Sequence, residues 1–142
     1  MIQSVILVID DDKLWRNILT RFLAASNYKV HSAATCNDGI KLAGSLRPDC
    51  IVLDFHLTDG TAADVCLRVR SREDIKTTPI VVLSSDPDAE MIAYGECRAD
   101  KFILKTVPLE SILLSIEDLI ASSALRTKRA DGEQDIPGPA LP

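Results

Sequence analysis

The sequence predicts an α/β fold in which helices cover both faces of a five-stranded parallel sheet. Five short apolar runs alternate along the chain with five segments whose apolar residues recur at helical spacing. Continuous apolar strands that alternate with helices are typical of a buried parallel sheet. Right-handed crossovers make this sheet the centre of an open, doubly wound sandwich, because five strands are too few for an eight-stranded barrel.

The expected strands are short and rich in β-branched residues. They span residues 5–9, 28–31, 50–53, 79–83 and 102–104. The run at 28–31 alternates between apolar and polar residues, whereas the other four are continuously apolar. We therefore expect most of the sheet to be buried on both faces.

The expected helices span residues 12–26, 37–46, 62–70, 88–97 and 108–121. The last one is the clearest, because Pro108 suits a first turn and six apolar residues after it form one stripe. The second is weaker, since two glycines interrupt it. Asp12 is expected to cap the first helix, and Asp86, Pro87 and Asp88 suit the start of the fourth.

The length of 142 residues predicts one domain at 1–122, followed by a flexible tail at 123–142. The apolar pattern ends near Ser122, and the tail contains Pro137, Pro139 and Pro142. Its three basic and three acidic residues balance. Such a composition does not provide the apolar surface that a packed core needs.

The composition excludes several classes of function. The net charge of −5 and the 4% of aromatic residues argue against a nucleic-acid partner. No apolar run approaches the ~18 residues of a membrane span, and the first residues do not resemble a signal peptide. The four cysteines form no C-x-x-C pair, so we expect buried free thiols in a cytoplasmic protein.

Polar residues follow four of the five expected strands. The first strand is followed by Asp10, Asp11 and Asp12, and the third by Asp54. The fourth is followed by Ser84 and Ser85, and the fifth by Lys105. The carboxyl ends of parallel strands meet at one edge of the sheet, where ligands bind in such folds.

This combination of side chains predicts a site for phosphoryl transfer. Two carboxylates about 4 Å apart repel by roughly 4 kcal/mol at an effective dielectric constant near 20, so a cluster of them favours a bound cation. Mg²⁺ prefers carboxylate, water and phosphate oxygens. A lysine ammonium suits a phosphate, and an aspartate can itself accept a phosphoryl group as an acyl phosphate.

Four segments together resemble the receiver domain of response regulators, the CheY-like family of two-component signalling. They are residues 8–12, 53–54, 82–85 and 102–105, and they stand in the family's order and spacing. The resemblance extends over about residues 4–122. It implies a flavodoxin-like (βα)5 sandwich whose strands have the order 2-1-3-4-5.

The resemblance also implies roles for individual residues. Asp54 matches the phosphoacceptor, and Asp10 and Asp11 match the acidic pair that organises Mg²⁺. Asp54 and the backbone carbonyl of His56 would complete the protein ligands of the ion. Asp12 is expected to act as a helix cap and not as a metal ligand.

Ser84, Lys105 and Phe102 match the remaining family positions. Ser84 corresponds to the hydroxyl residue that contacts the phosphoryl group, and Lys105 to the lysine that pairs with it. Phe102 corresponds to the aromatic residue that switches together with Ser84, although a plain core position is an equal alternative.

The implied partners are a sensor histidine kinase or a histidine phosphotransfer protein, and a downstream protein target. Phosphoryl transfer to Asp54 would change the preference for that target, through the surface of the fourth helix, fifth strand and fifth helix. We expect a stand-alone receiver without an output domain, a monomer or weak dimer, which is a phosphoacceptor and not an enzyme.

The chain departs from the family pattern at four positions. Thr58 and Thr106 stand where prolines are usual, and Ala62 and Arg98 where glycines are usual. Because the family's proline after the lysine usually follows a cis peptide, we expect Lys105–Thr106 to be either trans with a shifted loop or strained cis. Thr58 and Thr106 leave open an interaction module of receiver fold that does not use phosphate. A phosphatase with Asp54 as nucleophile is a third hypothesis, although no second aspartate is evident as its general acid.

Overall fold

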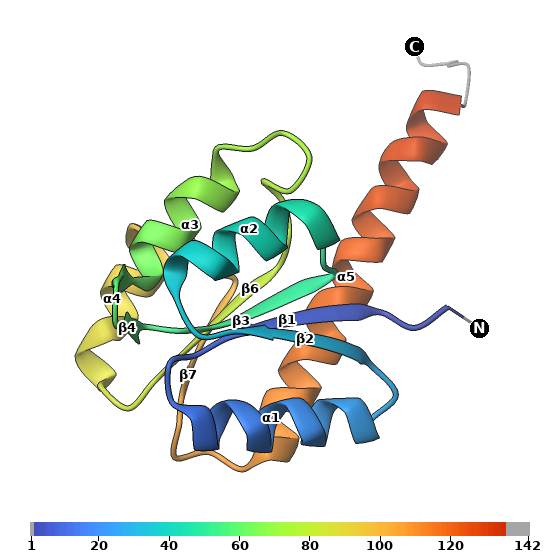
Figure 1. Ribbon diagram of the computed structural model, residues 1–142. Helices are drawn as coiled ribbons and strands as arrows, with labels where there is room; N and C mark the ends of the chain where they lie inside the picture. Colours follow the sequence, from blue (N-terminus) through green and yellow to red (C-terminus); the bar gives the residue numbers. More distant parts are fainter. Residues whose placement is uncertain (1, 136–142) are drawn as a thin grey trace.

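Five parallel strands form the centre of the computed structural model, which describes residues 2–135, with side chains as far as residue 126 (Figure 1). The strands are β1 (Val5–Ile9), β2 (Lys29–Ala33), β3 (Cys50–Asp54), β6 (Ile80–Ser84) and β7 (Lys101–Leu104). They pair in the order β2-β1-β3-β6-β7. In chain order this is 2-1-3-4-5, so the predicted sheet and its strand order are confirmed.

Helices cover both faces of this sheet (Figure 1). One face carries α1 (Lys13–Ala25) and α5 (Leu109–Asp135), and the opposite face carries α2 (Cys36–Leu46), α3 (Ala62–Arg70) and the short α4 (Glu90–Gly95). The buried residues accordingly form two clusters, one on each side of the sheet. This arrangement is the predicted doubly wound sandwich.

The continuous apolar strands supply both clusters, because successive side chains of a strand point to opposite faces. Ile6 and Val8 of β1 belong to the cluster under α1 and α5, whereas Leu7 and Ile9 belong to the other. Every residue of β3 and β6 is buried, including the polar residues Asp54 and Ser84 at their ends. The central strands therefore form a rigid support for the edge where they end.

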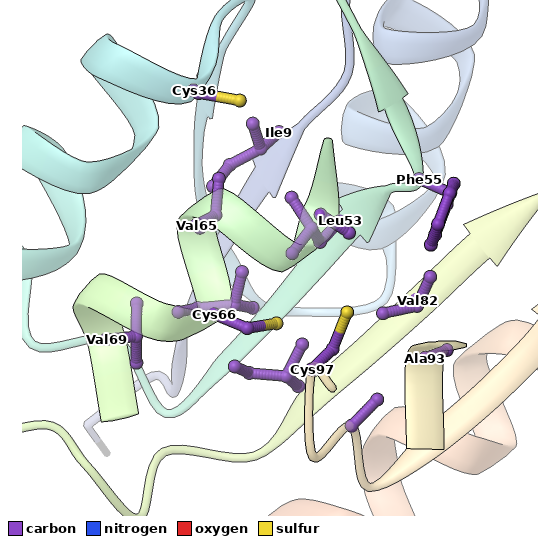
Figure 2. Packing of buried hydrophobic residues seen from close by; sticks show 14 of the residues in the cluster. Ile9, Cys36, Leu53, Phe55, Val65, Cys66, Val69, Val82, Ala93 and Cys97 are labelled. Carbon is purple, nitrogen blue, oxygen red and sulfur yellow. The ribbon is translucent and has the colours of Figure 1, made fainter. Parts of the chain in front are cut away.

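Figure 2 shows the cluster on the side of α2, α3 and α4, where side chains from β1 and β3 meet those of α3. Cys66 of α3 and Cys97 lie in it with their sulfur atoms toward each other. All four cysteines are buried and free of disulfides. Burial raises the pKa of the Cys50 thiol, which keeps it protonated. The expectation of buried free thiols is confirmed.

Two helical segments begin at the predicted capping residues. Asp12 accepts hydrogen bonds from the backbone N–H groups of Leu14 and Trp15 and so caps α1. Asp86 accepts a hydrogen bond of 2.9 Å from Asp88 N and begins a 3-10 turn, η1 (Pro87–Ala89). The fourth helix is shorter than the expected 88–97, because this turn replaces its first residues.

A small hairpin between β3 and α3 was not expected. It consists of β4 (His56–Leu57) and β5 (Gly60–Thr61), which pair antiparallel around a turn at Thr58 and Asp59. The Asp59 carboxylate accepts hydrogen bonds from the N–H groups of Cys36 and Asn37. These bonds hold the hairpin against the start of α2, a contact between residues far apart in sequence.

The last helix continues past residue 122, where the sequence predicts a flexible tail. α5 extends to Asp135, and the rest of the expected tail, 136–142, lies outside the described residues.

Among the residues that the structure describes there is no cis peptide bond, so Lys105–Thr106 is trans. Arg98 adopts the left-handed region with φ of 50° at a position where the family usually has glycine. No helix in the described part of the chain has the length and apolar character needed to cross a bilayer.

We predict that Ile116→Ala lowers the free energy of unfolding by about 2–5 kcal/mol, because it leaves a cavity in the core. Ile116 is fully buried between α5 and the sheet. Leu114→Ala is the matched control on the same helix, since Leu114 is 60% exposed, and it should change stability by less than about 0.5 kcal/mol. Urea unfolding measures both, and equal effects would contradict the described orientation of α5.

Candidate functional site

The predicted site residues come together at the carboxyl edge of the sheet. Asp10 follows β1, Asp54 ends β3, Ser84 ends β6 and Lys105 follows β7. An open depression at this edge is lined by Asp11, Asp12, Asp54, His56, Ser84, Ser85, Asp86 and Lys105. Topology thus brings together four segments that are separated by up to 95 residues along the chain.

Three carboxylates form the acidic part of the site. One oxygen each from Asp10, Asp11 and Asp54 lies within 4.8 Å of the others. Asp10 and Asp54 are only 1% and 9% exposed, whereas Asp11 is exposed. Hard oxygen ligands at this spacing suit a divalent cation such as Mg²⁺, which takes carboxylates together with water.

Asp10 is held in place by hydrogen bonds from the backbone N–H of Asp12 and from the side chain of Arg16. Its Oδ1 accepts a hydrogen bond of 2.9 Å from Asp12 N, which leaves Oδ2 to face the site. Arg16 Nη1 donates a hydrogen bond of 2.7 Å to the backbone carbonyl of Asp10. Arg16, one helical turn after Asp12, therefore lies beside the site.

The ammonium group of Lys105 lies between two carboxylates. Nζ is 3.1 Å from Asp10 Oδ2 and 3.2 Å from Asp54 Oδ1. The backbone N–H of Lys105 donates to the carbonyl of Ser84, which joins the ends of β6 and β7. Burial alone would lower the pKa of Lys105, but the hydrogen bond to Asp10 and the charge of Asp54 outweigh it and raise that pKa. Lys105 therefore stays charged.

The carboxylates carry more negative charge than Lys105 balances. Burial, followed by the charge of Asp10, raises the pKa of Asp54 to about 6 against the opposing effect of Lys105. Burial also raises the pKa of Asp10, although hydrogen bonds to Asp12 and Lys105 oppose it. Both pKa values are raised because Lys105 and the hydrogen bonds do not fully offset burial and the neighbouring negative charge. A divalent cation would supply the missing positive charge.

Ser84 and Phe102 each form a hydrogen bond with the segment that contains η1 and α4. Ser84 is 1% exposed, and its Oγ accepts a hydrogen bond of 3.0 Å from Asp86 N. Phe102 is buried in the cluster beneath α4, and its backbone N–H donates to the hydroxyl of Tyr94. The structure thus gives Phe102 a core position, and its switching role stays a prediction.

The side chains of His56 and Asp12 occupy the margin of the site. His56 is exposed, and its ring meets Phe55 edge-on at 4.8 Å between centroids. The carboxylate of Asp12 is engaged in capping α1. Trp15, which the sequence analysis does not assign to the site, has its ring centroid 5.4 Å from Lys105 Nζ.

Comparison with known proteins agrees with this geometry. Residues 6–117 match the family described as the response regulator receiver domain. Response regulator MprA of Mycolicibacterium vanbaalenii is 34% identical over 128 residues, which cover 89% of this chain and 53% of that protein. MprA of Mycobacterium leprae is 32% identical over 132 residues, covering 92% and 55%.

Solved structures show the same fold. A putative response regulator from Chloroflexus aurantiacus superposes with a TM-score of 0.80 at 24% identity, over 84% of this chain and 99% of that one. The chemotaxis response regulator CheY4 of Vibrio cholerae gives 0.76 at 24% identity, over 83% and 99%.

The chain belongs to the receiver-domain family of response regulators of two-component signalling. It spans about half the length of the curated relatives that it matches. The expectation that it acts without an output domain therefore stays a prediction.

We predict that Asp54→Asn stabilises the protein at pH 7 in the absence of divalent cations. A carboxyl with a raised pKa contributes stability while it is protonated, and loses that contribution as the pH rises through its folded value. The rise from 3.8 to about 6 corresponds to roughly 3 kcal/mol. Urea unfolding should therefore give equal stabilities near pH 4 and a difference that opens between about pH 4 and 6. A less stable Asn variant at pH 7 would contradict this account.

Proposed function

We propose that Asp54 accepts a phosphoryl group from a phosphohistidine of a sensor kinase or a histidine phosphotransfer protein. The observation that supports this most directly is the position of Asp54. Its carboxylate ends the central strand β3, contacts the ammonium of Lys105 at 3.2 Å and borders an open depression. An acceptor needs both this access from outside and a nearby positive charge.

In the proposed step, one Asp54 oxygen attacks the phosphorus atom. A P–O bond forms as the P–N bond to the donor histidine breaks, and the released ring nitrogen takes up a proton. Lys105 offsets the negative charge of the phosphoryl oxygens, and the Ser84 hydroxyl donates a hydrogen bond to one of them. The product is an acyl phosphate on Asp54, so the protein is a phosphoacceptor and not an enzyme that turns over a small substrate.

We propose Asp10, Asp11, Asp54 and the backbone carbonyl of His56 as the protein ligands of Mg²⁺. The three carboxylates meet the charge and oxygen-donor preferences of this ion. When bound, Mg²⁺ would neutralise charge on the acceptor and on the incoming phosphoryl group. Asp10 would contribute through Oδ2, since its Oδ1 accepts a hydrogen bond from Asp12 N.

The phosphoryl group would signal its presence through Ser84. In this structure Ser84 Oγ accepts a hydrogen bond from the backbone N–H of Asp86, the residue that caps η1 ahead of α4. Turning the hydroxyl toward a phosphoryl group changes this contact, and Phe102 lies beneath the same helix. We propose that the changed surface around α4, β7 and α5 selects a downstream protein in the cytoplasm.

We predict that a small acyl phosphate with Mg²⁺ adds one phosphoryl group to the wild-type protein and none to Asp54→Asn. Amide oxygens are poor nucleophiles, so the variant lacks the acceptor. Intact-mass spectrometry measures the addition. Asp118→Asn is the matched control, because Asp118 is an exposed aspartate on α5, and it should be phosphorylated like the wild type. Labelling of Asp54→Asn to the wild-type extent would overturn the assignment.

Mg²⁺ binding separates a phosphorylatable receiver from a receiver fold that does not use phosphate. At ten times its Kd, Mg²⁺ should raise the free energy of unfolding of the wild type by about 1.4 kcal/mol. Asp11→Asn should lose most of this gain at the same concentration, whereas Asp118→Asn should retain it. Urea unfolding with and without millimolar Mg²⁺ measures the effect. No stabilisation of the wild type would favour the phosphate-independent alternative.

A further inference from the structure

The indole ring of Trp15 lies beside the ammonium group of Lys105. Trp15 is in the first turn of α1, and Lys105 Nζ is 5.4 Å from the centroid of its ring. A cation within about 6 Å of an aromatic face is attracted by the ring quadrupole, most strongly by that of tryptophan. Helix α1 thus contributes an uncharged contact to the Lys105 ammonium, whereas the other side chains of the site come from the ends of strands.

Packing alone does not account for tryptophan at this position. The indole N–H of Trp15 is buried without a hydrogen-bond partner, and no other buried side-chain nitrogen or oxygen among the described residues is in that state. A buried donor without a partner is unfavourable. Leucine or phenylalanine would fill the same half-buried position without that cost, so the contact with Lys105 is the feature that favours an indole.

Trp15 differs in kind from the other two partners of Lys105. Asp10 and Asp54 hold the ammonium at 3.1 and 3.2 Å, and both are proposed metal ligands. When a cation and a phosphoryl group occupy the site, the ammonium must turn from these oxygens toward the phosphoryl group. The ring carries no net charge and ligates no magnesium, so its attraction for the ammonium persists through that change.

We propose that Trp15 is a positioning residue for phosphoryl transfer, whose ring holds the ammonium of Lys105 beside the acceptor oxygen of Asp54. This inference rests on the proposed function. Trp15 acts through Lys105, because its indole N–H has no hydrogen-bond partner and so does not bond to the proposed metal ligands. Replacing Trp15 should therefore lower the rate of phosphorylation of Asp54 and leave the affinity for Mg²⁺ nearly unchanged.

The first test compares aromatic substitutions on α1. With acetyl phosphate and saturating Mg²⁺, Trp15→Leu should slow phosphorylation of Asp54 by about 5-fold, and Trp15→Phe should recover part of that loss because it keeps a ring face. Phe22→Leu is the matched control, since Phe22 lies two turns further along α1 and packs against the same apolar cluster. It should leave the rate unchanged. Equal slowing by Trp15→Leu and Phe22→Leu would overturn the proposal.

The second test combines Trp15→Leu with Lys105→Met. If Trp15 acts through Lys105, replacing it in the Lys105→Met protein should not slow phosphorylation further. A purely structural role would slow the reaction by the same factor in both backgrounds, and that result would overturn the proposal. Urea unfolding of each variant identifies any loss of the folded state.

The third test leaves the packing of the ring intact. Because the sequence contains one tryptophan, biosynthetic replacement by 5-fluorotryptophan changes residue 15 alone. Fluorine withdraws electron density from the ring, so the rate should fall in the direction of Trp15→Leu but by a smaller factor. An unchanged rate in a phosphorylated protein overturns this inference alone. A wild-type protein that accepts no phosphoryl group overturns the proposed function and this inference together.

Discussion

The ion pairs of Lys105 with Asp10 and Asp54 join the ends of three strands across one site. The oxygens of the two buried carboxylates lie within 4.8 Å of each other and, when both are ionised, would repel by roughly 3.5 kcal/mol at an effective dielectric constant of 20. Lys105 offsets part of that repulsion, and burial keeps the pKa of Asp54 raised nonetheless. The site is therefore assembled but short of positive charge.

The doubly wound sheet makes this concentration of charge possible. β1 and β3 are covered on both faces, so their apolar side chains fix the positions where Asp10 and Asp54 emerge. Burial of polar groups at the ends of strands is unfavourable by itself. The two apolar clusters stabilise the sheet sufficiently to hold them there, which leaves the rim of the depression to less buried residues such as Asp11 and His56.

Two hydrogen bonds attach the segment around α4 to the sheet, one of them at the site. Ser84 Oγ accepts from Asp86 N at the entrance to the helix, and the Tyr94 hydroxyl accepts from Phe102 N at the edge strand β7. α4 is a single short helix preceded by a 3-10 turn, so these bonds restrain a segment with little helical support of its own. The arrangement gives a physical basis for the proposed communication between Asp54 and a protein partner.

The amino-acid sequence by itself determined the strands of the sheet and pointed to the residues that meet at the candidate site. Apolar runs of strand length identified all five strands of the sheet. The polar side chains that follow these runs identified Asp10, Asp54 and Lys105. Both signals are local in the sequence. The 2-1-3-4-5 order came from resemblance to a family. Only the tertiary structure decided the β4–β5 hairpin held by Asp59, the replacement of the start of the fourth helix by a 3-10 turn, and the extension of α5 past residue 122. It also decided the contact of Trp15 with Lys105, which depends on how a helix and a loop 90 residues apart pack on the sheet.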